Sequence, residues 1–490
     1  GKLPNLRETV TLITAVIVFF LVATLFDNVS AGERPSWVFG EMLPGLAISF
    51  VIEPLGMVFA GIASFLWIIT SVYTVGYMRG HHEANQTRFY ICFAVAISSA
   101  LGIAFAGNML TLFVFYEILT ISTFPLVTHS GTPEAKRAGR IYLGILIGTS
   151  IALQLVAIIW TYTLTGTLDF TPGGILEDKV APAMVAVLLS LYIFGIGKAA
   201  LMPFHRWLPA AMVAPTPVSA LLHAVAVVKA GVFTVLKVTV YIFGIDLLQA
   251  TDAGLWIAYM AATTILLASL VAMKKDNLKA RLAYSTISQL SYIILGAMMA
   301  SSLGIIGGAM HIVMHAFGKI TLFFCAGAIM VASHKSEISQ MRGLGRKMPI
   351  TFFCFLIASL SIIGLPPFGG VWSKWYLAIA AAETEQLIFL AVLMISSLLN
   401  VAYLIPIVVR GFYSDPTEQK HHDDHGHETH VASLPGDAAM ANQWKIGGLE
   451  EAPLPCVAAL TFTATGCVVL FIYADVIYRF LLPLISGGAS

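Results

Sequence analysis

The chain has 490 residues, of which 58% are hydrophobic and only 11% are charged, and its formal net charge is +1. A soluble domain carries about 25% charged residues, so this chain has too few polar side chains to cover a globule in water, which excludes a soluble enzyme. The nearly neutral balance also excludes a nucleic-acid-binding protein, which would present a basic surface.

Thirteen segments are long and apolar enough to cross a bilayer, which takes about 20 mostly apolar residues in a helix. They lie at residues 9–26, 54–77, 88–106, 108–128, 138–164, 182–204, 218–243, 254–273, 281–301, 303–332, 350–381, 386–411 and 456–483. We therefore predict an all-α polytopic membrane protein with thirteen transmembrane helices.

Lysine and arginine are distributed unequally between alternate loops of this arrangement. The side that holds the N-terminus carries Lys2, Arg7, Arg79, Arg88, Lys136, Arg137, Arg140, Arg206, Lys274, Lys275, Lys279, Arg281, Lys335, Arg342, Arg346 and Lys347. The other side carries Arg34, Lys179 and Arg479. Because short cytoplasmic loops carry an excess of Lys and Arg, we expect Gly1 to face the cytoplasm and the C-terminus to face outside.

The predicted helices group into repeated units. Residues 1–87 hold the N-terminal helices and an outer loop, and residues 88–243 and 254–411 each contain five predicted helices. A polar loop at 412–455 and a C-terminal helix within 456–490 follow. An odd number of helices turns the second unit over relative to the first, so we predict an inverted repeat.

The fourth helix of each unit is interrupted by proline. The first interruption lies within 198–209 and contains Pro203, and the second lies within 364–374 and contains Pro366 and Pro367. Proline removes a backbone donor and clashes with the preceding turn, and irregular backbone at membrane depth is tolerated only beside protein or a water-filled cavity. Paired interruptions in two halves point to a transport site, although simple packing kinks are the alternative.

A few ionisable residues stand inside the apolar segments. They are Glu117, Lys198, Lys229, Lys319 and Lys374, accompanied by His205, His223, His311 and His315. Each charge at the centre of a transmembrane helix costs about 2.5–3.5 kcal/mol, so these groups must be paired, hydrated or neutralised. We interpret all nine as candidates for a path that moves protons or ions.

Glu117 is the only carboxylate at such depth and is the expected partner of Lys198. A carboxylate that approaches a lysine favours its charged form, and withdrawal favours release of the proton. The pair is therefore predicted to act as a switch, and a static structural ion pair is the alternative.

His311, His315 and Lys319 follow one another at intervals of four residues, so they form a stripe on one helical face of about 12 Å in length. Histidine titrates near neutral pH and can relay protons. Zinc binding is the alternative, but no third ligand is in view, so we predict no metal site. For His223 alone, the alternative is a histidine that only satisfies a local hydrogen bond.

The polar loop contains a run of histidines within 421–430. A metal-sequestering loop and a solvated cytoplasmic linker both fit this composition. The five cysteines form no C-x-x-C pattern, and no G-x-G-x-x-G follows a strand, so the chain offers no iron–sulfur, zinc or nucleotide site. We predict no cofactor.

Three stretches resemble one protein family. Residues 107–119 resemble its glutamate helix, residues 198–208 its broken helix, and residues 214–224 the helix that follows. The family comprises the antiporter-like subunits shared by Mrp-type cation/proton antiporters and respiratory complex I. The resemblance implies a proton-transfer axis of Glu117, Lys198 and Lys229.

In the second unit, the resemblance assigns matching elements to His315, Lys319 and Lys374. It also implies fourteen helices, so the first would be absent here, in agreement with a chain that opens at Gly1 and not at Met. Because the chain ends just after Pro483, without the long C-terminal extensions of larger members, the Mrp D subunit is the best match. The histidine-rich loop does not match the family pattern.

The implied function is that of an ion transporter subunit, not an enzyme, in a bacterial cell membrane. It would translocate protons within a hetero-oligomeric antiporter complex that exchanges H⁺ for Na⁺ or another monovalent cation. The alternative is a proton-pumping subunit of a complex I-type or hydrogenase-type redox complex, because the buried charges serve both functions equally.

Overall fold

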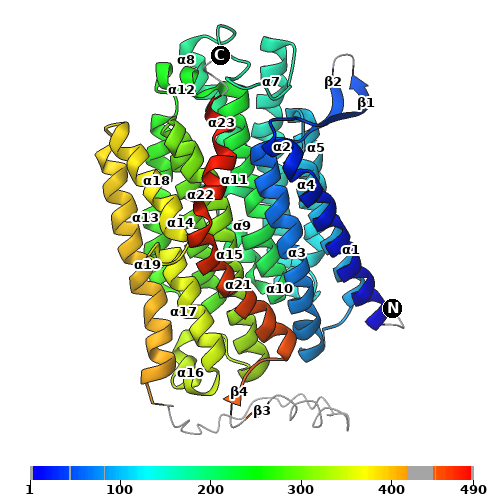
Figure 1. The fold of residues 1–490 in the computed structure, drawn as a ribbon, viewed down its shortest axis with the longest axis vertical. Coiled ribbons are helices and arrows are strands. Elements are labelled where there is room, and N and C mark those ends of the chain that lie inside the picture. The colour runs from blue at the N-terminus through cyan, green and yellow to red at the C-terminus, as the bar shows by residue number, and fades with distance from the viewer. Residues whose placement is uncertain (1–3, 44–45, 82, 416–444, 447–448, 487–490) are drawn as a thin grey trace.

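The structure is a computed structural model that describes residues 4–43, 46–81, 83–415, 445–446 and 449–486. Long helices run side by side along one direction and form a bundle (Figure 1). Ten helices in this described part are long and apolar enough to cross a membrane, and two shorter apolar helices accompany them. The prediction of an all-α polytopic membrane protein is confirmed, whereas the count of thirteen spans stays a prediction.

The first half of the chain contains the following elements: α1 Pro4–Thr24, α2 Phe26–Ser30, β1 Ser36–Leu43, β2 Leu46–Val51, α3 Pro54–Gly80, α4 Gln86–Ala104, α5 Met109–Val127, α6 Pro133–Thr149, the π-helical turn η1 Ser150–Gln154, α7 Leu155–Thr165, α8 Pro182–Gly195, the 3-10 turn η2 Gly197–Ala199, α9 Trp207–Ala210, η3 Ala211–Val213, α10 Thr216–Ala220, the π-helical turn η4 Leu221–Val225, α11 Val227–Lys237 and the π-helical segment η5 Val238–Phe243.

The second half contains α12 Ile245–Thr251, α13 Leu255–Lys274, α14 Leu278–Met298, α15 Ser302–Ser333, η6 Ile338–Met341, α16 Leu344–Lys347, α17 Pro349–Ile363, α18 Gly370–Glu383, α19 Leu387–Tyr413, β3 Lys445–Ile446, β4 Leu449–Glu450, α21 Leu454–Ile472, α22 Ala474–Leu481 and α23 Pro483–Ser486. The histidines of 421–430 lie outside the described residues.

A β-hairpin near the N-terminus was not predicted. Strands β1 and β2 pair antiparallel, and the ring of Trp37 stacks on that of Phe50 with 6.0 Å between centroids. We call the end of the bundle that carries this hairpin the hairpin end, and the end that carries Pro4 and α16 the opposite end (Figure 1).

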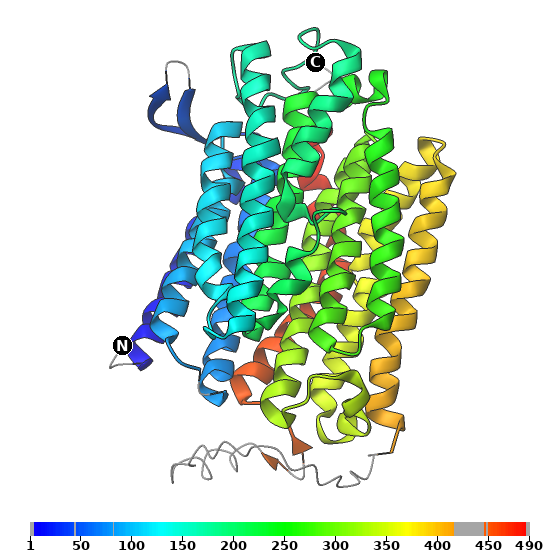
Figure 2. The ribbon, with the colours of Figure 1, turned by 180° about the vertical axis from the view of Figure 1, so that it is seen from behind.

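The helices divide into a buried centre and an outer layer. Helix α15 and the segment 216–243 are completely buried over their apolar windows, whereas α1 and α19 lie at opposite edges of the bundle in both views (Figures 1 and 2). The edge helices expose large apolar side chains such as Phe20 and Leu398, which are 62% and 70% exposed. Such side chains are suited to lipid, whereas Lys229, His311, His315 and Lys319 lie on the completely buried helices.

Both predicted interruptions are present. Helix α8 ends at Gly195, well before the predicted end at 204, and the chain continues through η2 to α9 without regular helix. Helix α17 ends at Ile363, and Gly364 adopts φ +90°, which a glycine reaches at low cost. Each break contains a cis proline bond, at Met202–Pro203 and at Pro366–Pro367.

Candidate functional site

Lys198 is fully buried in the first break. Its Nζ donates to the carbonyl oxygen of Tyr116 at 2.9 Å and to Oγ1 of Thr120 at 2.5 Å, and lies 3.1 Å from the centroid of the Tyr116 ring. The break itself is anchored, because the indole N–H of Trp207 donates to the carbonyl oxygen of Gly197 at 2.9 Å. The lysine is thus held in one position by the neutral groups of α5.

Glu117 does not form the predicted ion pair with Lys198. Its carboxylate oxygens are buried and, among the described residues, neither has a hydrogen-bond partner or a cation within 4.0 Å. Tyr116 and Thr120 are four residues apart and share one face of α5, while Glu117 is turned about 100° from Tyr116 around the helix. The sequence places Glu117 near the middle of its helix, as the structure does, but does not give its direction around the helix.

Lys229 of α11 meets the histidine stripe of α15. Its Nζ lies 2.6 Å from Nδ1 of His315, and the rings of His315 and His311 are 5.8 Å apart. Nδ1 of His311 lies 2.8 Å from Oγ of Ser373, the residue before Lys374. Contacts therefore connect the centre of the first unit with the second break.

Lys374 binds the end of the helix that precedes it. Its Nζ donates to the carbonyl oxygen of Ile363 at 3.1 Å and to Oγ of Ser397 at 3.2 Å, and lies 4.8 Å from the ring of Tyr292. Ile363 is the last residue of α17, so its carbonyl has no partner within that helix. The break thus provides an acceptor for the lysine.

Lys319 leads away from this row toward α19. Its Nζ donates to Oγ of Ser285 at 2.6 Å, and the same hydroxyl lies 2.8 Å from that of Tyr403. The Tyr403 hydroxyl in turn donates to Oδ1 of Asn400. A chain of hydroxyl groups therefore continues from the lysine through α14 into α19.

Lys198 and Lys229 come from adjacent backbones. A Cβ atom at Gly231 would lie 2.4 Å from the backbone nitrogen of Ala199, so only glycine permits α11 to pack this closely on the first break. Contacts therefore run from Lys229 through His315 and His311 to Ser373, which precedes Lys374, while the backbone of α11 packs on the break that holds Lys198. We call Lys198, Lys229, His315, His311 and Lys374 the lysine row.

His205 and His223 complete the predicted set. His205 lies in the first break with its ring 6.3 Å from that of Tyr284, and His223 lies in η4 with its ring 4.8 Å from that of Phe323. Within the described structure, neither ring nitrogen of His223 has a hydrogen-bond partner. The alternative, a histidine that only satisfies a local hydrogen bond, would therefore require a partner other than the described residues.

One pair of buried charges escaped prediction from the sequence. Lys237 stands inside the apolar segment 218–243, and its Nζ lies 2.8 Å from Oε1 of Glu53, the residue before α3. Lys237 could have been found as Lys229 was, because both interrupt an apolar run. Glu53 could not have been found in this way, because it lies just before the apolar segment 54–77 and not inside it.

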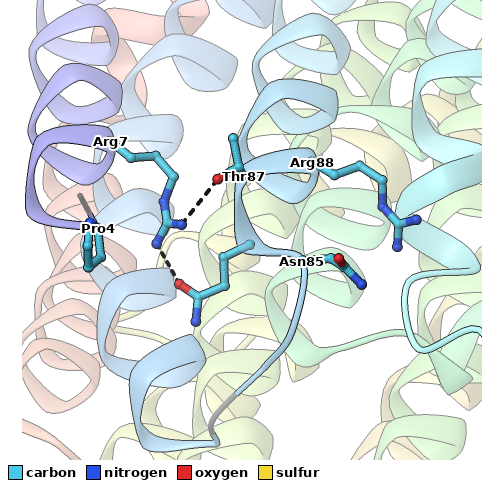
Figure 3. Close-up of a pocket in the computed structure, with 6 residues that line it drawn as sticks. Pro4, Arg7, Asn85, Thr87 and Arg88 are labelled. Carbon is cyan, nitrogen blue, oxygen red and sulfur yellow. Dashed lines mark hydrogen bonds between the residues drawn. The ribbon is translucent and has the colours of Figure 1, made fainter. Parts of the chain in front are cut away.

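A surface cavity of about 420 Å³ at the opposite end is separate from the lysine row. Arg7 donates to Oε1 of Gln86 at 2.6 Å beside it, and Arg88 also lines it (Figure 3). None of the four buried lysines of the predicted set lines this cavity. The cavity therefore does not provide an entrance to that row in this structure.

Comparison with known proteins points to the same family as the three sequence stretches at 107–119, 198–208 and 214–224. Residues 106–400 match the family described as NADH:quinone oxidoreductase/Mrp antiporter, TM. The N subunit of the NADH-quinone oxidoreductase of Desulforudis audaxviator is 32% identical over 393 residues, covering 79% of this chain and 77% of that protein. The A/B component of a probable K⁺/H⁺ antiporter of Rhizobium meliloti is 32% identical over 380 residues, covering 76% of this chain and 37% of that protein.

The chain spans 49% of another relative, chain 5 of the NAD(P)H-quinone oxidoreductase of Synechocystis, to which it is 33% identical over 67% of its own length. Among solved structures, a chain of the Mrp complex from Dietzia aligns with a TM-score of 0.82 at 21% identity, covering 98% of this chain and 92% of that chain. A chain of an archaeal membrane-bound sulfane sulfur reductase aligns with the same TM-score at 23% identity, covering 98% and 91%. The chain belongs to the NADH:quinone oxidoreductase/Mrp antiporter family of membrane subunits.

Proposed function

We propose that this chain is the proton-translocating subunit of a multisubunit cation/proton antiporter in a bacterial cell membrane, of the Mrp D type. The observation that carries the proposal is the set of buried lysines and histidines, of which Lys229, His311, His315 and Lys319 lie on completely buried helices. In the described structure, Lys229, Lys319 and Lys374 contact only neutral acceptors and have no carboxylate within 4.0 Å. No fixed negative charge therefore offsets their positive charges.

Such lysines are suited to carry protons. An ammonium group in a dry apolar environment is costly, and loss of its proton removes the cost. Water or a nearby carboxylate favours the charged form again. Alternate wetting and drying of the row would therefore load and unload protons from one lysine to the next.

Unpartnered polar atoms line the same region. Among the described residues, these atoms include Nδ1 of His205, both ring nitrogens of His223, Nε2 of His311 and of His315, and both polar atoms of the Gln289 side chain. Buried polar groups without a protein partner are commonly satisfied by internal water. They support the proposal because water molecules could bridge the gaps between the lysines.

Glu117 and Lys198 would act as the switch of the first unit. With its Nζ on Tyr116 and Thr120, Lys198 has no carboxylate within 4.0 Å among the described residues, and a rotation toward Glu117 would provide a counterion. Movement of the lysine between these partners changes its preference for the proton. The pair would thus couple a small rearrangement to proton uptake and release.

The breaks are the proposed gates. Moving one charge across 100 mV takes about 2.3 kcal/mol, so an uninterrupted wire would dissipate the proton gradient. The segments around Pro203 and Pro366 are irregular and directly adjoin Lys198 and Lys374. Their movement could open one side of the path while closing the other.

A second candidate is a proton-pumping subunit of a redox-driven complex. Relatives from quinone oxidoreductases and the aligned chain from the sulfane sulfur reductase complex favour this candidate. The lysine row would serve either complex, because the source of energy would lie in the partner subunits.

The test uses the complete complex, expressed from its neighbouring genes in a bacterial host that lacks its own antiporters. Everted vesicles are given a proton gradient by respiration, and Na⁺ or K⁺ is then added. An antiporter collapses the gradient when one of these cations is added. If neither cation has an effect and the purified complex contains iron–sulfur or quinone-binding subunits, the antiporter proposal is wrong and the redox candidate replaces it.

A further inference from the structure

Glu53 and Lys237 form a buried ion pair outside the lysine row. Oε1 of Glu53 lies 2.8 Å from Nζ of Lys237, and the two side chains are 7% and 2% exposed. The hydroxyl of Tyr241 donates to the other carboxylate oxygen. Glu53 is the N-cap residue of α3, but its side chain makes no capping hydrogen bond. Its carboxylate instead contacts Lys237 of α11 and Tyr241 of η5.

The contact between Glu53 and Lys237 leaves room for a second donor. Within the described residues, Oε1 of Glu53 has no hydrogen-bond donor apart from the Lys237 ammonium, whose Nζ lies at 2.8 Å. A carboxylate oxygen has more than one lone pair, so this oxygen can also accept a hydrogen bond from water or accept a proton.

Aromatic rings surround the ammonium group and separate it from solvent. Nζ of Lys237 lies 4.3 Å from the ring of Phe170 and 4.7 Å from that of Tyr241. Phe170 belongs to the segment between α7 and α8, which lies at the hairpin end, and its N–H is bonded to the carbonyl oxygen of Gly107. Phe170 is partly exposed and follows the exposed Asp169, so one ring covers the pair.

The same helix connects this pair with the lysine row. Lys237 follows Lys229 by eight residues of α11, which corresponds to a rise of about 12 Å toward the hairpin end. The backbone changes to the π-helical segment η5 directly after Lys237, and such segments are frequent at functional sites. A buried base, an acid and a hydroxyl thus lie between the centre of the row and the solvent.

We propose that Lys237, Glu53 and Tyr241 form the terminal of the proton path at the hairpin end, with Phe170 as its cover. The inference rests on the proposed function. A proton leaves Lys229 and reaches neutral Lys237 through water, passes from the Lys237 ammonium to the Glu53 carboxylate, and leaves Glu53 for solvent. Lys237 is then neutral again and Glu53 is again a carboxylate, so the terminal is ready for the next proton.

Lys237→Arg separates this role from a structural one, since arginine retains the ion pair with Glu53 but does not release its proton in proteins. Glu53→Gln keeps the shape and removes the proton acceptor. In the vesicle assay, each variant is expected to lower exchange at least about a hundredfold while the complex stays assembled, as loss of a proton-transfer group does. Lys179→Arg, at an exposed lysine of the same end, is the matched control and is expected to exchange normally.

If an assembled Lys237→Arg or Glu53→Gln complex exchanges at the wild-type rate, the proposal that this pair ends the proton path is wrong. If Lys237→Arg does not assemble, Glu53→Gln decides the question, and if neither assembles the pair is structural and the proposal is wrong. Glu117→Gln is measured in parallel. Normal exchange by Glu117→Gln as well would refute the proposed function, whereas normal exchange by the Glu53 and Lys237 variants alone would refute only the terminal.

Discussion

The two breaks hold their lysines in different ways. Lys198 lies within the first break and binds the carbonyl oxygen of Tyr116 and the hydroxyl of Thr120, which stand one residue before and three residues after the unpartnered Glu117. Lys374 lies beyond the second break, in the first turns of α18, and binds the last carbonyl oxygen of α17.

Under the proposed function, this difference would give two ways to control a buried proton carrier. In the first unit, a side-chain rotation of Lys198 toward Glu117 would supply a counterion. For Lys374 the described residues offer no carboxylate within 4.0 Å, so its charged form depends on the partial negative charge at the end of α17 and on water. We therefore expect the first unit to switch by pairing and the second by hydration.

The largest effect is expected from the switch itself. Glu117→Ala or Lys198→Ala should abolish exchange in everted vesicles, because each removes one partner of the proposed pair, while insertion and assembly remain normal. Proton-transfer groups typically contribute about 10²–10⁴-fold. Near wild-type exchange by an assembled complex of either variant would refute the Glu117–Lys198 switch. It would also refute the proposal that the first unit switches by ion pairing and the second by hydration.

Lys319 tests whether the second unit contains a proton carrier in addition to Lys374. Lys319→Ala should also abolish coupled exchange, because it removes the ammonium that binds Ser285 and begins the chain of hydroxyl groups toward Tyr403. The measurement is the same vesicle assay, with assembly checked by purification of the complex. Normal exchange would show that protons do not need this branch.

A smaller effect is expected at the contact between α11 and the first break. Gly231→Ala would place Cβ 2.4 Å from the backbone nitrogen of Ala199, and overpacking of this kind typically costs about 1–3 kcal/mol. The variant should lower the thermal stability of the purified complex and reduce exchange. Gly144→Ala is the control, because no atom lies within 4 Å of the added Cβ. Equal melting temperatures for both variants would show that this contact does not hold Lys198 in place.

The sequence predicted the apolar spans and the breaks well. The predicted segments 54–77 and 303–332 correspond to the helices Pro54–Gly80 and Ser302–Ser333. They agree because the ends of the apolar run set the ends of such helices. The breaks followed from Pro203 and Pro366. The orientation in the membrane and the inverted repeat stay predictions.

Other features could not be predicted from apolar runs, because they depend on side-chain direction, on contacts between distant residues or on local backbone geometry. The position of Glu117 within its apolar segment suggested the Glu117–Lys198 pair, but in this structure Lys198 binds Tyr116 and Thr120, and the Glu117 oxygens have no hydrogen-bond partner among the described residues. The Glu53–Lys237 pair joins residues distant in the chain, one of which lies outside any apolar run. The hairpin of β1 and β2 lies in a segment predicted only as a loop, and the π-helical segments leave no mark on hydrophobic periodicity.

The smallest effect is expected from the histidines of 421–430. Their deletion should leave cation/proton exchange by the complex unchanged, because the segment has the composition of a solvated linker and lies between the last two predicted spans. The deletion variant is assayed in the same vesicles, with zinc or nickel added in a second series. Loss of activity that either metal restores would reveal a metal site in this loop.

The most direct test of a path that joins both units compares two alanine variants in one vesicle preparation. Contacts run from Lys229 through His315 and His311 to Ser373, beside Lys374, and α11 packs on the break that holds Lys198. We therefore predict that Lys198→Ala and Lys374→Ala each abolish coupled exchange. Lys374→Glu should retain part of the activity, because a carboxylate also carries a proton. If Lys374→Ala exchanges ions at the wild-type rate while Lys198→Ala does not, only the first unit conducts and the lateral path is wrong.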